Sequence, residues 1–188
     1  MRSSEVSALW RPVPGLDLSA TAYSLNISDS ITLVALPDDT QQYVNAGRIR
    51  SRGLEWEATQ AFDSGVQARA SWSVQQGVDR ETGATLSDSP RSLLKLMLTA
   101  PGPWAGARFG ANLVRVGERL TLAGTRLAPY VRINAQLIHA PTGQPWSLSL
   151  GVYNLAGRRY ADPAGPEHVQ DALTQDGRRW RMQLGWAF

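Results

Sequence analysis

The 188-residue sequence contains no cysteine, so it can form neither a disulfide framework nor a thiolate metal site. It also has no long hydrophobic run. The longest apolar stretch, Leu93–Leu98, is interrupted by Lys95 and falls far short of the roughly 18 apolar residues that a membrane-spanning helix needs. The first residues, Met1–Pro12, lack the apolar core of a signal peptide, so we expect any export signal to lie upstream. These absences exclude a disulfide-stabilised domain and a helical membrane span.

Lysine is scarce as well, and almost all of the positive charge behind the net charge of +3 is arginine. Arginine-rich surfaces bind nucleic acid, anionic lipid or acidic ligands. No helix-turn-helix, zinc-finger or aromatic RNA-binding motif accompanies the arginines, so we expect no nucleic-acid partner.

The dominant hydrophobic period is two residues, which is the period of a β-strand rather than of an α-helix. In Trp180–Phe188 the large apolar side chains fall on every even position, and Val66–Gln75, Val131–Leu137 and Trp146–Tyr153 alternate similarly. Each such segment has one apolar and one polar face. The pattern predicts an all-β fold with about nine strands, near residues 4–11, 16–33, 47–61, 65–77, 90–100, 105–117, 128–140, 145–155 and 176–188.

The connections between these strands differ in kind. Tight turns at 12–15, 63–65, 101–103 and 142–144 alternate with longer polar connections at 37–46, 78–89, 117–127 and 156–175. Outer-membrane barrels have short periplasmic turns and long extracellular loops. The sequence therefore predicts an antiparallel transmembrane β-barrel. A soluble β-sandwich, with its apolar face turned inward, has the same alternation and is the alternative.

Aromatic residues favour the membrane interpretation, because barrels carry aromatic girdles at both membrane interfaces. Those near tight turns or the C-terminus are Trp10, Phe62, Trp104, Trp146, Trp186 and Phe188. Those toward the long connections are Trp72, Tyr130 and Trp180.

Four local patterns resemble TonB-dependent receptors, which import scarce nutrients such as ferric siderophores. They are Asn45-Ala46-Gly47 followed by Arg52-Gly53-Leu54-Glu55-Trp56-Glu57; Asp88-Ser89-Pro90 before an apolar strand; Tyr153-Asn154-Leu155 with Arg159-Tyr160; and Gly177-Arg178-Arg179 with Trp186-Ala187-Phe188. They occur in the family's order and spacing. One departure is Ala156-Gly157, where the family usually has an aromatic residue and an aspartate.

The resemblance implies that residues 1–188 are the C-terminal portion of a larger barrel in the bacterial outer membrane, without the plug domain and N-terminal strands. Transporters of this class have 22 strands and a plugged lumen. The implied function is TonB-dependent uptake of a ferric siderophore or similar chelate, not enzymatic catalysis. The implied partners are outer-membrane lipid, lipopolysaccharide, the iron chelate and, through a missing N-terminal region, the TonB complex. Trp186 and Phe188 would belong to the signal read by the barrel-assembly machinery.

Charged residues within the strands give the first group of candidate site residues. Glu55 and Glu57 share a strand face, as catalytic carboxylates might, but neither fits a known catalytic pair, and no Ser/His/Asp order accompanies them. We expect them, together with Arg69 and Arg132, to face the lumen and the plug. His139 and His168 are isolated in the sequence, whereas metal sites need several ligands at defined spacing, so we expect no metal site and no cofactor.

Polar residues of the long connections give a second group, because ligand contacts concentrate in loops displayed by a rigid scaffold. The ligand-mouth candidates are Arg80, Arg119, Arg126, Arg158, Arg159, Tyr160 and His168. A separate run, Arg48, Arg50 and Arg52, shares parity with the apolar side chain of Leu54. If no bulge intervenes, these arginines point outward above the apolar band, where they either meet lipopolysaccharide phosphates or extend the strand into solvent.

Other functions remain open at this point. A passive porin-like or adhesin-type barrel would have no plug, and a non-functional truncated receptor would have no partner strands. A barrel enzyme would lose hydrolysis on mutation of Glu55 or His139, and a soluble lipid-binding β-barrel would be monomeric without detergent.

Overall fold

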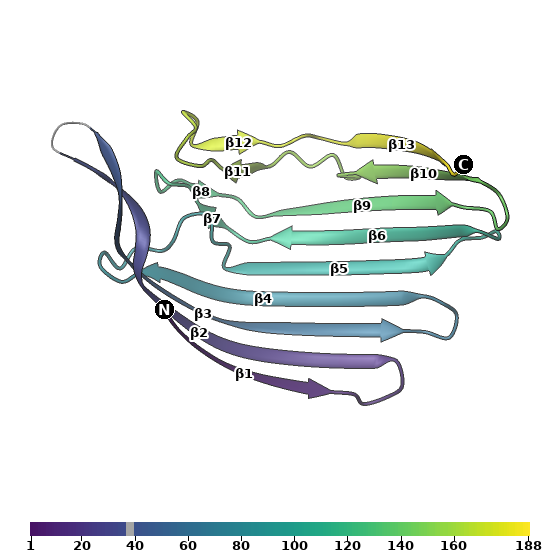
Figure 1. The fold of residues 1–188 in the computed structure, drawn as a ribbon, viewed down its shortest axis with the longest axis horizontal. Coiled ribbons are helices and arrows are strands. Elements are labelled where there is room, and N and C mark those ends of the chain that lie inside the picture. Colours follow the sequence, from purple (N-terminus) through teal and green to yellow (C-terminus); the bar gives the residue numbers. More distant parts are fainter. Residues whose placement is uncertain (37–39) are drawn as a thin grey trace.

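The computed structural model describes residues 1–36 and 40–188, and it contains one antiparallel sheet of nine strands. In spatial order these are β1 (Arg2–Trp10), β2 (Leu16–Ala35), β3 (Gln41–Ala61), β4 (Gln67–Asp79), β5 (Ser92–Pro101), β6 (Ala107–Val116), β9 (Tyr130–His139), β10 (Trp146–Tyr153) and β13 (Arg179–Trp186). Successive strands of the sheet are neighbours, and β1 and β13 form its two edges (Figure 1). This confirms the predicted all-β fold and the number of main strands. No helix in the described part of the chain is long and apolar enough to cross a membrane.

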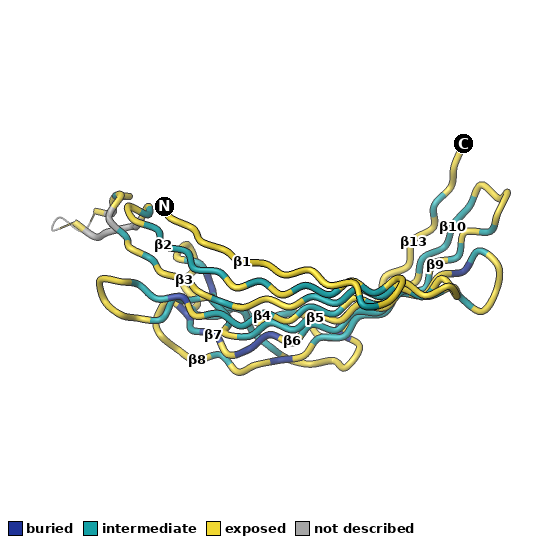
Figure 2. Tube along the Cα trace, turned by 90° about the horizontal axis from the view of Figure 1, so that it is seen from below, coloured by how far each residue is buried: buried dark blue, intermediate teal, exposed yellow. Residues whose placement is uncertain are grey.

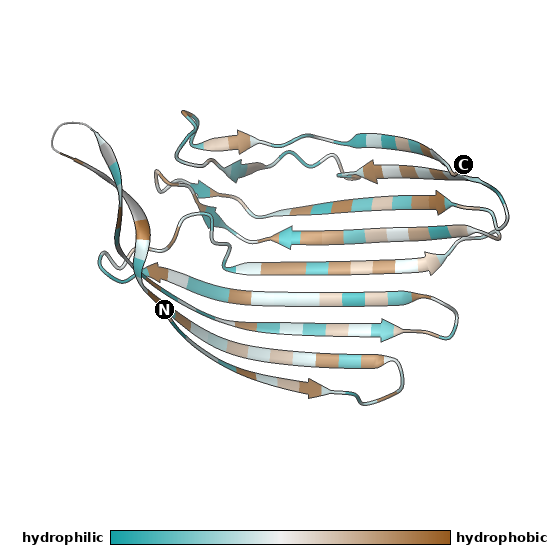
Figure 3. Ribbon diagram, in the orientation of Figure 1, coloured by the Kyte–Doolittle hydropathy of each residue, from teal (hydrophilic) through white to brown (hydrophobic). Residues whose placement is uncertain are grey.

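Cross-strand register aligns the alternating side chains of all nine strands into two continuous faces. One row pairs Ala58 with Ala70, Leu96, Leu113 and Ile133 in turn. We call the face that carries this row the apolar face. It consists of the even-numbered residues of β1, β2 as far as Asn26, β3 from Arg50, β4, β5, β10 and β13, and the odd-numbered residues of β6 and β9. The alternating bands of colour in Figure 3 show this pattern along the strands.

The opposite side of the sheet, which we call the polar face, carries the remaining strand residues. One of its rows pairs Glu57 with Ser71, Lys95, Val114 and Arg132 in turn. Because successive residues of a strand point to opposite faces, every charged residue in this row has apolar-face neighbours immediately before and after it in the chain.

The sheet is a single curved layer with very little core of its own (Figure 2). Its accessible surface is 12999 Å², whereas a compact monomer of this mass exposes about 8,900 Å². Large apolar residues such as Met182 and Leu184 are about 70% exposed. Because exposed apolar area on this scale is unfavourable in water, the apolar face requires a non-aqueous neighbour.

One predicted long connection is wrong. The segment 37–46 was expected to be a loop, but β3 already begins at Gln41 and pairs with Ala35 of β2; residues 37–39 of that segment lie outside the described residues. The two strands have 20 and 21 residues and extend beyond the sheet as a two-stranded ribbon (Figure 1). Here the extra chain is hydrogen-bonded strand rather than loop, so the predicted strict alternation of short turns and long loops fails at this hairpin.

The ribbon begins at an irregularity in β2. The register between β2 and β3 shifts between Ile27 and Ser30, where Asp29 has a φ of 59°. Such an extra residue is a β-bulge, which bends one strand and increases its twist. This first bulge lies in β2, and a second shift, between Ser30 and Ile31, adds a residue in β3 between Gly47 and Asn45. The pairing of β3 with β4 continues without a shift from Ile49 onward, so Arg50 and Arg52 keep the parity of Leu54.

Two small hairpins within the long loops were not predicted from the sequence. β7 (Arg119–Leu120) pairs with β8 (Arg126–Leu127), and β11 (Ala161–Pro163) pairs with β12 (Ala172–Thr174). Strands of two or three residues are too short to produce a recognisable alternation. These hairpins lie at the same end of the sheet (Figure 1), and the hairpin of β7 and β8 supplies the buried polar side chains of Arg119 and Thr121.

Candidate functional site: the polar face and the loops above it

The polar face carries charges of both signs at short range. Arg69 Nη2 lies 2.6 Å from Glu57 Oε2, on the neighbouring strand, and Glu55 lies two residues before Glu57 on the same face. These residues and Lys95 line a hollow of about 590 Å³ in the polar face. The sheet therefore places Glu55, Glu57 and Arg69 close together on one face, and Arg132 lies on the same face three strands beyond β4. That these residues face a plug stays a prediction.

Two long loops meet at the end of the polar face through a cluster in which Arg119 and Tyr130 are buried and Tyr160 and Asp162 are half-buried. We call Arg119, Tyr130, Tyr160 and Asp162 the loop clamp. Its central guanidinium, with Arg119 only 6% exposed, donates to Asp162 Oδ1 at 2.7 Å and to the Ala161 carbonyl at 2.9 Å. The rings of Tyr130 and Tyr160 stack with centroids 4.0 Å apart, and Arg119 lies 5.4 Å from the Tyr130 centroid.

The loop clamp joins the loop of β7 and β8 to the loop of β11 and β12, and then to the sheet. Arg132 Nη1, which belongs to the polar face, donates to Tyr160 Oη at 3.2 Å. Buried side-chain hydrogen bonds to charged groups are costly to break, because the remaining partner stays desolvated. The two loops and the end of the polar face are therefore fixed relative to one another.

Asn154 fixes the start of the last loop, and it explains the Tyr153-Asn154-Leu155 pattern. It is 3% exposed, with a φ of 51°, in the left-handed region that asparagine tolerates better than most residues. Its Nδ2 donates to the carbonyls of Arg158 and Asp176, and its Oδ1 accepts from the Arg158 amide. One side chain thus links the beginning of the loop to its end. Sequence reasoning gave Asn154 no role of its own.

Asp171, in the loop of β11 and β12, forms a second connection to the loop of β7 and β8. Sequence reasoning did not predict this connection. Hydrogen bonds from Thr121 and then Thr125 hold the pKa of the Asp171 carboxyl below its usual value, against a smaller opposing effect of desolvation. Thr121 is 2% exposed, and its Oγ1 also accepts from the Thr125 amide at 3.0 Å. The ionised form of Asp171 is therefore the one that stabilises the closed arrangement.

The ligand-mouth candidates fall into two groups. Arg119 and Tyr160 belong to the loop clamp and contact protein rather than open space. The exposed candidates are Arg80, Arg126, Arg158, Arg159 and His168. Of these, Arg126 pairs with Glu118 at 2.6 Å, and His168 Nε2 lies 3.5 Å from Glu167 Oε1.

The aromatic residues follow the predicted two levels, with one correction. Trp146 and Trp186 pair on the apolar face near the tight turns, and Trp72 stacks on Trp56 with centroids 5.0 Å apart. Tyr130, which was expected in the girdle toward the long connections, instead pairs with Val116 on the polar face beneath the loops. Its parity is that of Arg132, and the loop clamp buries it.

His139 is accounted for by packing. Its ring lies edge-on to Trp104 and Trp146, and its Nδ1 accepts a hydrogen bond from Trp104 Nε1 at 3.1 Å. Within residues 1–36 and 40–188, no three His, Asp or Glu side chains gather as a metal site would require.

A single curved antiparallel sheet with a continuous apolar face, tight turns at one end and long loops at the other is the wall of a transmembrane β-barrel. The family model described as "TonB dependent receptor-like, beta-barrel" matches residues 2–155. The chain belongs to this outer-membrane family, which is a family of receptors and transporters rather than a class of enzymes. The resemblance stated from the sequence motifs is thereby confirmed. No curated protein sequence matches the chain.

Solved structures of receptors and transporters for iron chelates and copper share the fold. The ferric-catecholate import receptor Fiu from E. coli K12 is 18% identical, with a TM-score of 0.74, over 99% of this chain and 27% of Fiu. The ferric preacinetobactin receptor BauA from Acinetobacter baumannii is 14% identical, with a TM-score of 0.75, over 98% of this chain and 29% of BauA. The copper transporter OprC is 17% identical, with a TM-score of 0.77, over 99% of this chain and 31% of OprC. The chain spans less than a third of each of these proteins.

Proposed function

We propose that this chain forms the C-terminal part of the barrel wall of an outer-membrane receptor that imports a ferric siderophore or a similar chelate by a TonB-dependent mechanism. The observation that carries the proposal is the family match over residues 2–155 on a sheet whose two faces differ as a barrel wall requires. Fiu and BauA are described as receptors for ferric chelates, which favours such a ligand. OprC is described as a copper transporter, so the experiment below must include copper.

In this proposal the polar face lines the lumen and contacts a plug domain. Glu57 and Arg69 neutralise one another, whereas Glu55 and Lys95 line the same hollow at other positions. A face with charges of both signs suits a polar protein surface better than it suits lipid, because lipid cannot solvate charge. The plug, and the N-terminal segment that would bind TonB, would be supplied by other parts of the protein.

The loops would form part of the ligand mouth. The loop clamp holds their backbone, while Arg158 and Arg159 remain exposed nearby. Exposed guanidinium groups on a fixed scaffold attract anionic ferric chelates. Trp186 and Phe188, at the end of β13 and beyond it, would serve the barrel-assembly machinery, and Phe188 is fully exposed for such a contact.

The test is uptake of radiolabelled iron chelates, and separately of copper, by iron-limited bacteria that express the intact protein. We expect uptake of a ferric chelate that stops when TonB is deleted or when a protonophore collapses the proton-motive force. Uptake that continues under both treatments would instead identify a passive porin-like barrel. If the cells accumulated copper but not iron, the transported substrate would be copper rather than a ferric chelate.

The mouth can be tested in the same cells. We expect Arg158→Ala/Arg159→Ala to weaken chelate binding while leaving the amount of folded receptor unchanged. Arg11→Ala is the matched control, because Arg11 is an exposed arginine near a tight turn that pairs with Asp17. Equal binding by all three proteins would remove Arg158 and Arg159 from the mouth.

A further inference from the structure

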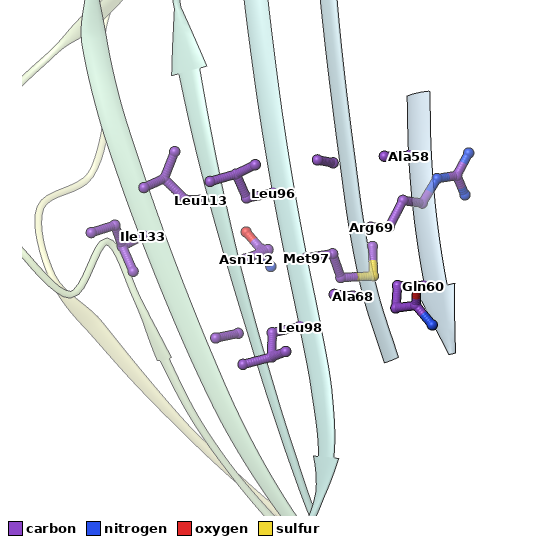
Figure 4. Close-up of a pocket in the computed structure, with 12 residues that line it drawn as sticks. Ala58, Gln60, Ala68, Arg69, Leu96, Met97, Leu98, Asn112, Leu113 and Ile133 are labelled. Atoms are coloured by element: carbon purple, nitrogen blue, oxygen red, sulfur yellow. The ribbon is translucent and has the colours of Figure 1, made fainter. Parts of the chain in front are cut away.

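The two faces of the sheet differ in how the chain covers them. On the apolar face, Arg50 and Arg52 border an open hollow of about 530 Å³, and Figure 4 shows another, of about 350 Å³, beside Leu96 and Leu98. On the polar face, in contrast, the loop between β4 and β5 folds back over the long-loop end of the sheet. The same strands thus have an uncovered side and a side that loops cover at one end.

The loop between β4 and β5 is held to the polar face along its second half. The Leu86 amide donates to the Gly77 carbonyl at 3.1 Å. A Cβ at Gly77 would lie 2.8 Å from Leu86 Cδ1, so the leucine side chain packs directly on this glycine. Gln75 Nε2 donates to the Pro90 carbonyl at 3.2 Å and lies 3.4 Å from Ser89 Oγ. Gln75 and Gly77 both belong to the polar face, so the loop lies over that face.

Asp88 connects this loop to the loop of β7 and β8. Its amide donates to the Leu120 carbonyl at 2.8 Å, and its Oδ1 lies 3.8 Å from Arg119 Nη1. Asp88 has a φ of 47°, in the left-handed region that aspartate and asparagine adopt more readily than most residues. The Asp88-Ser89-Pro90 pattern therefore fixes its loop at two points: Ser89 and Pro90 contact the sheet, and Asp88 contacts the next loop.

One nitrogen of Arg119 serves two loops. Its Nη1 lies 2.7 Å from Asp162 Oδ1 and 3.8 Å from Asp88 Oδ1. The Arg119 side chain is 6% exposed, whereas the Asp88 side chain is 67% exposed. A buried guanidinium depends on nearby carboxylates, because water does not reach it to replace them. A movement of Arg119 would therefore release contacts to both loops at once.

The charges around Arg119 balance when the loop between β4 and β5 is included. Arg119 and the neighbouring Arg132 bring two positive charges to the loop clamp, and Asp162 brings one negative charge. Asp88 adds a second negative charge on the side of the remaining loop. Excess charge in a partly buried cluster is unfavourable. Asp88 thus stabilises the position of its loop beside the loop clamp.

The loop of β7 and β8 is the centre of these contacts. Asp171 and the loop clamp connect it to the loop of β11 and β12, and Asp88 connects it to the loop between β4 and β5. Its first residue, Gly117, donates its amide to the Ser92 carbonyl at 2.8 Å, at the start of β5. A continuous set of contacts therefore joins three loops to one another and to the sheet.

We propose that these three loops, residues 80–91, 117–129 and 154–178, form one cap that opens and closes as a unit, with Arg119 as the latch that they share. Local unfolding occurs in cooperative units whose contacts depend on one another. When one outer loop leaves, Arg119 loses a carboxylate and the central loop loses half of its support, so the other outer loop becomes easier to open. The cap is a property of the loops themselves and does not depend on which solute the protein transports.

Hydrogen exchange of the intact protein in lipid vesicles, measured by mass spectrometry, tests the cap. Leu86→Ala and Asp88→Asn perturb the loop between β4 and β5 only, and asparagine tolerates the φ of Asp88. Glu81→Gln is the matched control, because Glu81 lies in the same loop but pairs with Arg48 of β3 at 3.7 Å. Asp162→Ala perturbs the cap from its other side. Retarded migration without heating on SDS gels verifies that each barrel is folded.

We expect Leu86→Ala to speed exchange about tenfold, and Asp88→Asn about threefold, by similar factors in all three segments of the cap. Asp162→Ala should also speed exchange in 80–91, although it lies in a different loop. Glu81→Gln should leave 117–129 and 154–178 unchanged. Faster exchange only in the mutated loop, or in no segment, would overturn the cap. An equal response of all three segments to Glu81→Gln would overturn the role of Asp88 and Arg119 as its latch.

Discussion

The two faces of one sheet are built from the same strands but obey opposite rules of charge. On the polar face, acids and bases lie close together, as Glu57 and Arg69 do at 2.6 Å. On the apolar face, the middle rows are uncharged and the rim carries arginines only. The difference follows from the neighbour that each face requires, because water or protein can solvate charges of either sign and hydrocarbon can solvate neither.

Aromatic and arginine side chains also have different surroundings on the two sides of the sheet. Tyr130, on the polar face, and Arg119, in the loop of β7 and β8 above it, form internal contacts. Trp186 and Arg50 lie on the apolar side, where they are exposed to whatever surrounds the sheet. The same residue type therefore serves cohesion on one side and contact with the surroundings on the other.

The largest expected effect comes from placing a charge in the middle of the apolar face. We expect Ala70→Arg to destabilise the intact protein in a bilayer by about 2–4 kcal/mol, because a guanidinium at mid-depth loses its hydration. The adjacent change Ser71→Arg, on the polar face, is the matched control and should cost far less. Denaturant unfolding in lipid vesicles measures both. Equal costs would show that the apolar face does not meet lipid.

We expect a smaller loss of folding stability when the loop clamp is broken. Asp162→Ala leaves the guanidinium of Arg119 buried without its carboxylate, and we expect a cost of about 2 kcal/mol, reduced because the Asp162 side chain is 37% exposed. Hydrogen exchange should increase in both 117–129 and 154–178. Arg126→Ala removes the exposed pair with Glu118 and should change exchange little. Faster exchange in only one loop would contradict a shared clamp.

The polar face can also be disturbed sterically. A Cβ at Gly53 would lie 2.7 Å from both the Tyr23 Oη and the Val74 carbonyl oxygen, so Gly53→Ala must displace the Tyr23 ring or the strand. We expect a loss of about 1–2 kcal/mol by overpacking and loss of the hydrogen bond from Tyr23 Oη to Gln75. Gly110→Ala is the control, because its Cβ would meet nothing within 4 Å. Denaturant unfolding compares the two, and a larger loss at Gly110 would refute the packing argument.

The smallest effect concerns pH. Hydrogen bonds lower the pKa of the Asp171 carboxyl in the folded protein below its value in the unfolded chain. The ionised carboxylate therefore contributes fully to the stability of the folded state above the unfolded pKa of about 4, and this contribution is lost as the pH falls through the lower folded pKa. We expect hydrogen exchange in the loop of β11 and β12 to increase as the pH falls below about 4, after correction for the intrinsic exchange rate. Asp171→Asn should remove that increase. An unchanged pH dependence in the variant would assign the effect to another group.

The motifs quoted from the sequence had structural counterparts that the sequence could not show. The period-two pattern predicted the nine main strands because alternation is a local property of a strand. It missed β7, β8, β11 and β12, which are too short to alternate, and it placed a loop at 41–46 where the chain continues as strand. The side chain of Asn154 links segments more than 20 residues apart, and no local pattern reveals such a link.

For the candidate site, too, the sequence predicted local features but not contacts between distant segments. Parity alone predicted that Glu55, Glu57 and Arg69 share a face, and the register confirmed that they do. Parity could not distinguish buried Arg119 from exposed Arg158, because both lie in loops that have no period. The sequence also could not show that the arginines of the apolar face border hollows, since a hollow depends on side chains from several strands at once.

By itself, then, the sequence determined the strands, the two faces and the family, because each depends on alternation and short motifs along one segment of chain. Only the tertiary structure decided the register across strands, the closure of the loops and the pairing of charges. These depend on contacts between distant segments, for which neighbouring residues carry no signal.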